Sequence, residues 1–226
     1  SFPTRRSSDL VVSDKGFKAW LVEEHSIPLA AIKIVFTGSG YAYDAKGKEG
    51  RANMTAALLM EGAGDLNDRA FSEALENRAI QMNVGVDEDN FNLSVECLSE
   101  HLDTAFSLLG MALTQPRFDD SSIERVKAQT QSVLLQQQGD PGYQLERAWA
   151  QAAYGDHPYG RPQIGYKDSV PSLEKADFKL LTQQFLSKEN MVIAVVGDIT
   201  EKDLKKQLDS HFGALAEHYK PDTSVP

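Results

Sequence analysis

The sequence is short of cysteine, of basic residues and of long apolar runs, and each shortage excludes a class of protein. Cys97 is the only cysteine in 226 residues, so neither a disulfide framework nor a zinc cluster built from several cysteines is possible. Lys and Arg number 23 against 33 Asp and Glu, and a net charge of −10 without a basic patch argues against nucleic-acid binding. No apolar run approaches the roughly 18 residues of a membrane-spanning helix, so none is predicted.

Both ends of the sequence differ in character from the rest. The first ten residues, "SFPTRRSSDL", match the translation of a common sequencing-adapter end, TCTTTCCCTACACGACGCTCTTCCGATCT. We therefore expect residues 1–10 to be a non-native extension, an expectation that genomic DNA coding for them at this locus would refute. Any true signal peptide before Val11 would then have been lost from this sequence, so the lack of a signal-peptide pattern is no evidence about export. The polar residues 217–226 are predicted to be a linker to a missing C-terminal domain.

The order of apolar patterns predicts one α+β domain over residues 11–216. Alternating or β-branched runs predict strands over 17–22, 29–37 and 190–198, and a hairpin over 80–98 with "DEDN" as its turn. Helical spacing predicts helices over 50–61, 68–77, 101–114, 119–138, 142–153, 173–187 and 200–213. Because strands and helices come in blocks, we expect a mostly antiparallel sheet covered on one face by helices.

Several motif-like strings lack the spacing that their chemistry needs. "GYAYDAKGKE" resembles a phosphate loop, but Glu49 stands where a magnesium-binding Ser or Thr is required. Cys97, Glu100 and His101 have the spacing of an inverted zinc motif with Cys in place of the first His. Cys97 ends a predicted strand, however, and Ser99 is a helix-cap residue, so we expect a buried thiol beside an exposed helix start. The remaining histidines are isolated in sequence and are expected on the surface or in loops: His25, His157, His211 and His218.

Five strings occur in the same order as in one metallopeptidase family. They are "AWLVEEHSIPLAAIKIVFTGSG", "DAKGKEGRANMTAALLMEGAG", "LTQPRFDDSSIERVKAQ", "YGDHPYGRP" and "MVIAVVGDIT". From about Phe17 to Gly213 the chain resembles the N-terminal domain of the pitrilysin/insulinase-type metallopeptidases. That group includes the mitochondrial processing peptidase and bacterial paired-subunit peptidases, and the resemblance implies their fold.

The resemblance also indicates where a zinc site would lie. Active members carry H-x-x-E-H on the helix after the "GK-G" turn, with a further glutamate ligand on a later helix. Aligned on "GKEG", the positions of the first His, the Glu and the second His hold Asn53, Ala56 and Ala57. Aligned on "IERVKAQ" and the following Asp-Pro, the distal Glu position falls at about Val133. Methyl groups cannot bind a cation and a lone amide is a poor zinc ligand, so we expect no metal in this chain and a buried packing helix instead.

The resemblance implies a non-catalytic subunit of a heterodimeric zinc peptidase. Such a subunit closes the chamber and helps bind the peptide substrate, with zinc on a homologous partner subunit that carries H-x-x-E-H. Main-chain hydrogen bonding of an extended peptide is expected at a sheet edge or in the glycine-rich loop, and the "DEDN" turn is a further chamber-lining candidate. The predicted peptide-binding residues are Gly38, Ser39, Gly40, Tyr41 and Tyr43.

Three other functions are kept as alternatives. They are an active zinc metalloendopeptidase, a purely structural subunit like the core proteins of respiratory complexes, and a stand-alone peptide-binding or chaperone-like module. Bacterial paired members imply the periplasm, with the cytoplasm as the alternative. Stoichiometric zinc in the purified chain would favour the first alternative, and an adjacent gene coding for H-x-x-E-H would favour the peptidase pair.

Overall fold

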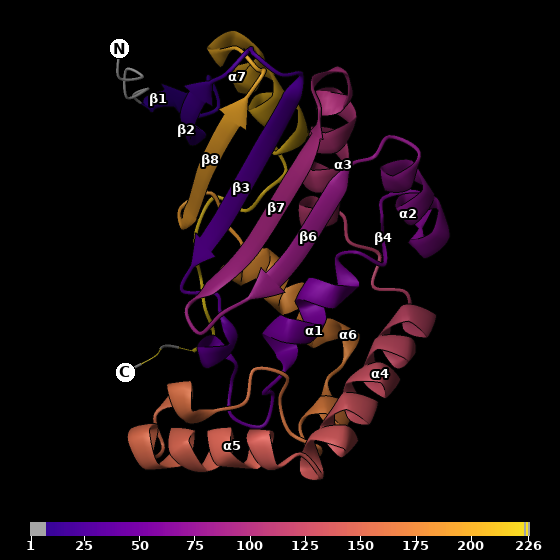
Figure 1. The fold of residues 1–226 in the computed structure, drawn as a ribbon, viewed down its shortest axis with the longest axis vertical. Coiled ribbons are helices and arrows are strands. Elements are labelled where there is room, and N and C mark those ends of the chain that lie inside the picture. The colour runs from indigo at the N-terminus through magenta and orange to yellow at the C-terminus, as the bar shows by residue number, and fades with distance from the viewer. Residues whose placement is uncertain (1–7, 224, 226) are drawn as a thin grey trace.

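A six-stranded sheet is the centre of the protein, as the computed structural model describes it for residues 8–223 and 225 (Figure 1). Its strands are β1 (Asp9–Val12), β2 (Lys18–Glu23), β3 (Leu29–Thr37), β6 (Gln81–Val86), β7 (Asn90–Leu98) and β8 (Met191–Gly197). Their spatial order is β1-β2-β8-β3-β7-β6. Only the β2–β8 pair is parallel, so the predicted mostly antiparallel sheet is confirmed.

The helices follow the predicted order with two differences. They are α1 (Arg51–Leu58), α2 (Asp68–Glu76), α3 (Leu102–Thr114), α4 (Asp120–Gln138), α5 (Pro141–Tyr154), α6 (Lys175–Leu180) and α7 (Glu201–His211). The predicted helix over 173–187 is α6 followed by a π-helical turn, where the Thr182 hydroxyl donates to the carbonyls of Phe178 and Lys179. The glycines after α1 form a small hairpin of β4 (Gly62–Ala63) and β5 (Leu66–Asn67), which the sequence pattern does not predict.

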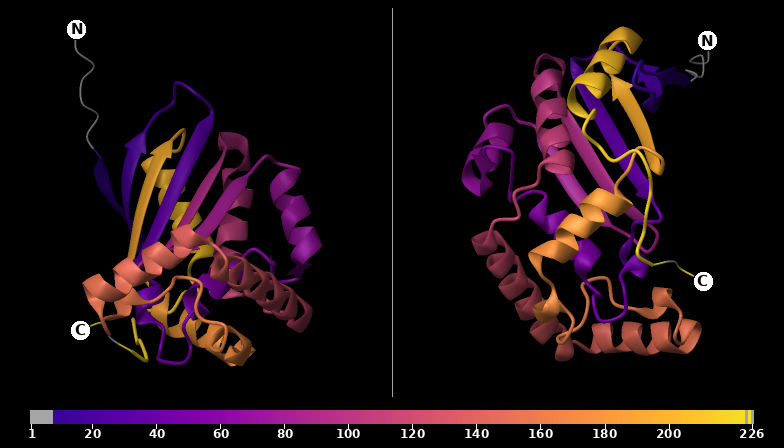
Figure 2. Two further views of the ribbon diagram at one scale, coloured as in Figure 1. Left: turned by 60° about the horizontal axis from the view of Figure 1, so that its bottom comes forward. Right: turned by 180° about the vertical axis from the view of Figure 1, so that it is seen from behind.

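Helices cover one face of the sheet, as predicted. Along β3, Ile32 and Ile34 are buried, whereas Ala31 and Lys33 on the opposite face are exposed. Seen from behind, α3 and α7 lie across the buried face (Figure 2). Burial of this alternate set of side chains against two helices provides the main hydrophobic stabilisation of the domain.

A second layer of helices lies beyond one end of the sheet. In Figure 1, α1, α4, α5 and α6 lie below the lower end of the strands, and Figure 2 shows the same arrangement from two other directions. The β6–β7 turn and the end of β3 point toward this layer. The helix with the degenerate zinc positions therefore lies where the sheet ends and the helical layer begins.

The predicted boundaries fall partly outside the described residues. Residues 1–7 lie outside them, while Asp9 and Leu10 belong to β1 and pair with Leu21 and Trp20. That pairing does not depend on the origin of the two residues, so a non-native origin of residues 1–10 stays a prediction. Likewise, the linker role of 217–226 stays a prediction, although its described residues pack against the domain.

Candidate functional site

Helix α1 begins on a carboxylate that comes from outside the helix. Gly50 is its N-cap residue with φ of 96°, and a Cβ there would lie 2.7 Å from the carbonyl oxygen of Ile164. The Asp44 carboxylate accepts hydrogen bonds from the amides of Gly50 and Ala52, each at 3.0 Å. These bonds satisfy two main-chain donors that the first helical turn leaves unpaired. The "DAKGKEGRA" stretch thus fixes the direction of α1.

The degenerate positions on α1 lie on two different faces of the helix. Met54, Ala56 and Leu58 are buried in the core. Asn53 is half-buried and Ala57, four residues later on the same face, is exposed. The expected buried packing helix is therefore confirmed for most of α1 and wrong at Ala57, where one face of the helix opens to solvent.

The fourth degenerate position lies on the neighbouring helix. Val133 of α4 is 42% exposed, and α4 packs against α1. Residues 8–223 and 225 hold no group of three or more His, Cys, Asp or Glu side chains that would suit a metal ion. The donor set at the four aligned positions is one amide and three alkyl groups, which does not fit zinc.

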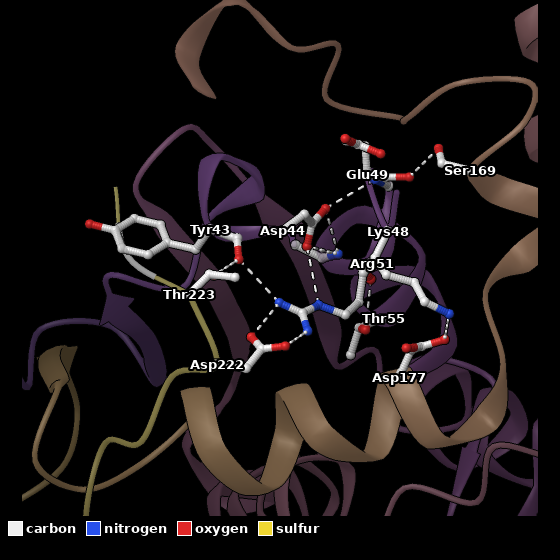
Figure 3. A network of polar contacts seen from close by, with 12 residues as sticks. Tyr43, Asp44, Lys48, Glu49, Arg51, Thr55, Ser169, Asp177, Asp222 and Thr223 are labelled. Carbon is white, nitrogen blue, oxygen red and sulfur yellow. Dashed lines mark hydrogen bonds and ion pairs between the residues drawn. The ribbon is translucent and has the colours of Figure 1, made fainter. Parts of the chain in front are cut away.

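A buried arginine next to the degenerate positions joins α1 to the C-terminal tail (Figure 3). Arg51 is 1% exposed, and its Nε lies 3.4 Å from Oδ1 of Asp44. Its Nη1 and Nη2 donate to the two carboxylate oxygens of Asp222 at 3.0 and 3.2 Å, and Nη2 also donates to the Tyr43 carbonyl at 3.1 Å. The guanidinium carbon lies 4.8 Å from the centroid of the Phe185 ring. Sequence reasoning missed this cluster, because arginine is seldom buried and its partners are distant in sequence.

The Asp44 carboxyl makes stability depend on pH. Burial raises the pKa of Asp44 to about 7, against the opposing effects of Arg51 and the two helix amides. The folded state therefore holds a proton between about pH 4 and 7 that the unfolded chain has released, and stability falls as pH rises through this window. We expect Asp44 to contribute a loss of up to about 1.4 kcal/mol per pH unit.

Urea denaturation at several pH values checks this expectation. Asp44→Asn removes the titrating group, so its free energy of unfolding should have a flatter pH dependence than that of the wild type. The two proteins differ at this one carboxyl alone, so a difference in slope is due to Asp44. Equal slopes in the two proteins would show that Asp44 stays ionised throughout.

An aromatic cleft lies between the β6–β7 turn, α5 and residues 158–164. We call it the α5 cleft; its volume is about 460 Å³. Five aromatic side chains line it: Tyr41, Tyr143, Trp149, Tyr154 and Tyr159. The Tyr41 hydroxyl donates to Glu88 at 2.8 Å and the Tyr159 hydroxyl to Asp89 at 2.6 Å. Desolvation and the Glu88 carboxylate raise the pKa of Tyr41, so this phenol stays a donor at neutral pH.

The "DEDN" turn is held in place by its own first residue. The Asp87 carboxylate accepts from the amides of Asp89 and Asn90 and from the Asn92 side chain. These hydrogen bonds outweigh burial and lower the pKa of Asp87. The turn thereby holds Glu88 in place as part of the cleft lining.

The predicted peptide-binding residues of the glycine-rich loop divide into two sets. The Gly38 carbonyl accepts from the Tyr219 hydroxyl at 2.5 Å, and the buried Ser39 hydroxyl donates to the Phe185 carbonyl at 2.7 Å. A Cβ at Gly40 would lie 2.3 Å from the Glu88 carbonyl oxygen, so this glycine allows close main-chain packing. Tyr41 lines the α5 cleft, and Tyr43 borders a shallow hollow beside the tail. Peptide binding stays a prediction for all five, and these contacts favour Tyr41.

The cysteine and histidine candidates do not form a metal site. Cys97 is buried in β7, where burial raises its pKa to about 11, while Glu100 and His101 lie in the following 3-10 turn. The expected buried thiol at the end of a strand is therefore confirmed, whereas the expected cap is wrong, because Ser99 is the first residue of the 3-10 turn and its side chain does not cap it. The other histidines have separate neighbours: His25 contacts Asp198 and Glu23, His157 caps a 3-10 turn, His211 contacts Asp103 and His218 lies near Glu189.

The chain belongs to the insulinase family, peptidase family M16. Residues 20–167 match the family described as "Insulinase (Peptidase family M16)". Residues 172–226 match the one described as "Peptidase M16 inactive domain". The resemblance inferred from the five sequence strings is thereby confirmed.

Known relatives agree with this membership. The "Non-peptidase homolog YmxG" of Helicobacter pylori is 28% identical over 193 residues, which are 85% of this chain and 44% of that protein. The "Probable mitochondrial-processing peptidase subunit beta" of Schizosaccharomyces pombe is 22% identical over 197 residues, covering 85% of this chain and 42% of that protein. The chain thus spans less than half the length of both.

Solved structures show the same fold. The crystal structure of the peptidase M16 inactive domain from Pseudomonas fluorescens superposes with a TM-score of 0.87 at 24% identity. It covers 94% of this chain and 52% of the solved one. The fold of the chain is therefore that of one half of such a protein.

Proposed function

We propose that this chain is a non-catalytic subunit of a two-chain M16 peptidase, which closes the chamber and helps hold the peptide. The observation that carries this proposal is the chemistry of the four aligned positions: Asn53, Ala56, Ala57 and Val133. Zinc hydrolysis needs three protein ligands and a general base, and these side chains supply neither. In the proposed pair, zinc is held by a homologous partner with H-x-x-E-H, and the periplasm is the proposed location.

The end of the sheet supports a role in peptide binding. β6 is an edge strand, and no described strand pairs with its outer side, so main-chain groups there suit an added peptide strand. Its last residue, Val86, lines the α5 cleft, and the Gln163 side chain donates to the Val86 carbonyl at 3.0 Å. A peptide along β6 would therefore reach the aromatic cleft, where its side chains could be selected.

The names of two relatives support different parts of the proposal. The Helicobacter pylori relative is called a non-peptidase homolog, which agrees with a lost activity, and the Schizosaccharomyces pombe relative is called a probable subunit beta of a processing peptidase, which agrees with a pair of chains. An active zinc enzyme is disfavoured by the donor set. The donor set does not separate the proposal from the other two alternatives, a structural subunit and a stand-alone peptide-binding module. They differ from it in whether a catalytic partner needs this chain for proteolysis.

Co-expression with an H-x-x-E-H homologue from the same genome tests the proposal. We expect the two chains to co-purify, zinc to be stoichiometric with the partner alone, and labelled casein to be cleaved only by the pair. Stoichiometric zinc bound to this chain when it is purified without the partner would contradict the proposal. Cleavage by the partner at an unchanged rate without this chain would favour the structural alternative.

Trp149→Ala tests the α5 cleft. Trp149 is 61% exposed and forms an edge-on contact with Tyr154 at the cleft wall. We expect the pair to bind labelled casein about tenfold more weakly, as for loss of one aromatic contact residue. Trp20→Ala is the matched control, since Trp20 is 48% exposed on the open face of the sheet, away from the cleft. Equal affinities of the two variants would place the peptide elsewhere.

A further inference from the structure

Residues 219–223 lie against the domain as an extended segment, which we call the strap. The Lys220 amide donates to the Gln184 carbonyl at 2.8 Å, and the Tyr219 amide donates to Glu189 at 2.9 Å. The Tyr219 ring meets Phe185 edge-on with centroids 6.1 Å apart. These contacts anchor one end of the strap on the helical layer.

The other end of the strap is fastened to the buried arginine. The Asp222 carboxylate accepts hydrogen bonds from both terminal nitrogens of Arg51 in a bidentate ion pair. The Thr223 hydroxyl donates to the Tyr43 carbonyl (Figure 3). The same carbonyl accepts from Arg51. Asp222, Arg51 and the loop around Tyr43 therefore form one connected cluster.

The two carboxylates on Arg51 are not equivalent. Asp44 is fully buried and is tied to the start of α1, whereas the Asp222 side chain is 31% exposed. Above about pH 7, where Asp44 is ionised, Arg51 keeps its ion pair with Asp44 if the strap leaves, and water reaches both Asp222 and the outer guanidinium nitrogens. Departure of the strap therefore breaks one ion pair but leaves no buried charge without a partner. An unpaired buried charge would be the costly outcome.

We infer that residues 219–223 are a detachable strap, latched by Asp222 on Arg51, that leaves and re-joins the domain without unfolding it. While docked, the strap occupies the carbonyls of Gly38 and Tyr43. Its release frees the Gly38 carbonyl, leaves the Tyr43 carbonyl with the Arg51 bond alone, and removes the wall that Tyr219 and Thr223 form on the hollow beside Thr37 and Tyr43. The Gly38 and Tyr43 carbonyls, which lie in the loop that the sequence assigns to peptide binding, therefore gain free hydrogen-bonding capacity only in the released state.

Hydrogen exchange of the full chain at pH 8, where Asp44 is ionised, tests the latch. In the wild type we expect the Lys220 amide to exchange at least 100-fold faster than the amides of β8, because local opening suffices. In Asp222→Asn the Lys220 amide should exchange at least tenfold faster again, with β8 unchanged. Thr223→Val, which leaves the ion pair intact, should give a smaller acceleration of about threefold.

Glu217→Gln is the matched control. It removes one carboxylate from the same tail, where Glu217 pairs with Lys188 and not with Arg51. We expect wild-type exchange at Lys220 in this variant. The inference is overturned if Asp222→Asn exchanges like the control. It is equally overturned if the variant speeds exchange throughout β8 or fails to fold, because the strap is then part of the fold.

Discussion

Replacing Arg51 by methionine is expected to lower the free energy of unfolding by about 3–5 kcal/mol at pH 8. The substitution removes the charged partner of the fully buried Asp44 and leaves that carboxylate with only the hydrogen bonds from the Gly50 and Ala52 amides. It also unlatches Asp222 and removes a donor from the Tyr43 carbonyl. At pH 5 the loss should be smaller, because Asp44 can then take up a proton. Urea denaturation at both pH values measures the effect.

Two further variants separate two effects on the free energy of unfolding: the unpaired buried charge of Asp44 and the loss of any arginine side chain. Arg69→Met is the exposed control, since Arg69 makes only a surface pair with Glu73, and its cost should be below about 1 kcal/mol. Adding Asp44→Asn to Arg51→Met should recover part of the lost stability, because no charge is then left buried. Additive losses in the double variant would contradict this explanation.

Zinc affinity should rise at least about 100-fold when three ligands are put back at the aligned positions. The variant is Asn53→His with Ala57→His and Val133→Glu. Asn53 and Ala57 share one helix face, and Ala57 and Val133 are exposed, so the new side chains have room. Competition with a chromophoric zinc indicator measures the affinity.

A shifted carboxylate provides the control for the restored site. Gln136→Glu in place of Val133→Glu keeps the two histidines and moves the acid by about one helical turn. We expect this variant to gain no more than about tenfold, from the two histidines alone. If the two triple variants bind zinc equally well, Val133 is not the distal ligand position.

The fold was largely predictable because apolar and polar residues alternate regularly along its strands. The 80–98 hairpin and the 29–37 strand carry one apolar face each, and both appear in the structure as β6, β7 and β3. The position of β8 between β2 and β3 was not predictable from pattern, since its pairing joins residues more than 150 positions apart. The π-helical turn after α6 depends on a local hydroxyl contact that apolar spacing does not report.

The candidate site was predictable only where family motifs align. The string "GKEG" located Asn53, Ala56 and Ala57, yet it did not show which of them face solvent. Arg51 was missed because a charged residue beside an apolar run is ordinarily taken for a surface residue. Its partner Asp222 lies in a polar tail, and no sequence signal links the two. An arginine at the first position of a helix rich in alanine is a signal that could have prompted a search for a buried ion pair.

The insertion of β8 has a consequence for how the chain folds. β2 and β3 are neighbours in sequence, yet each pairs with β8 and not with the other. During synthesis their hydrogen-bonding edges stay open until residues 191–197 have left the ribosome, which exposes them to wrong partners. Residues 20–167, which match the insulinase family, lack this strand, so they cannot complete the sheet alone. We therefore expect the two matched segments to fold as one cooperative unit, and to close slowly because β8 pairs with strands distant in sequence.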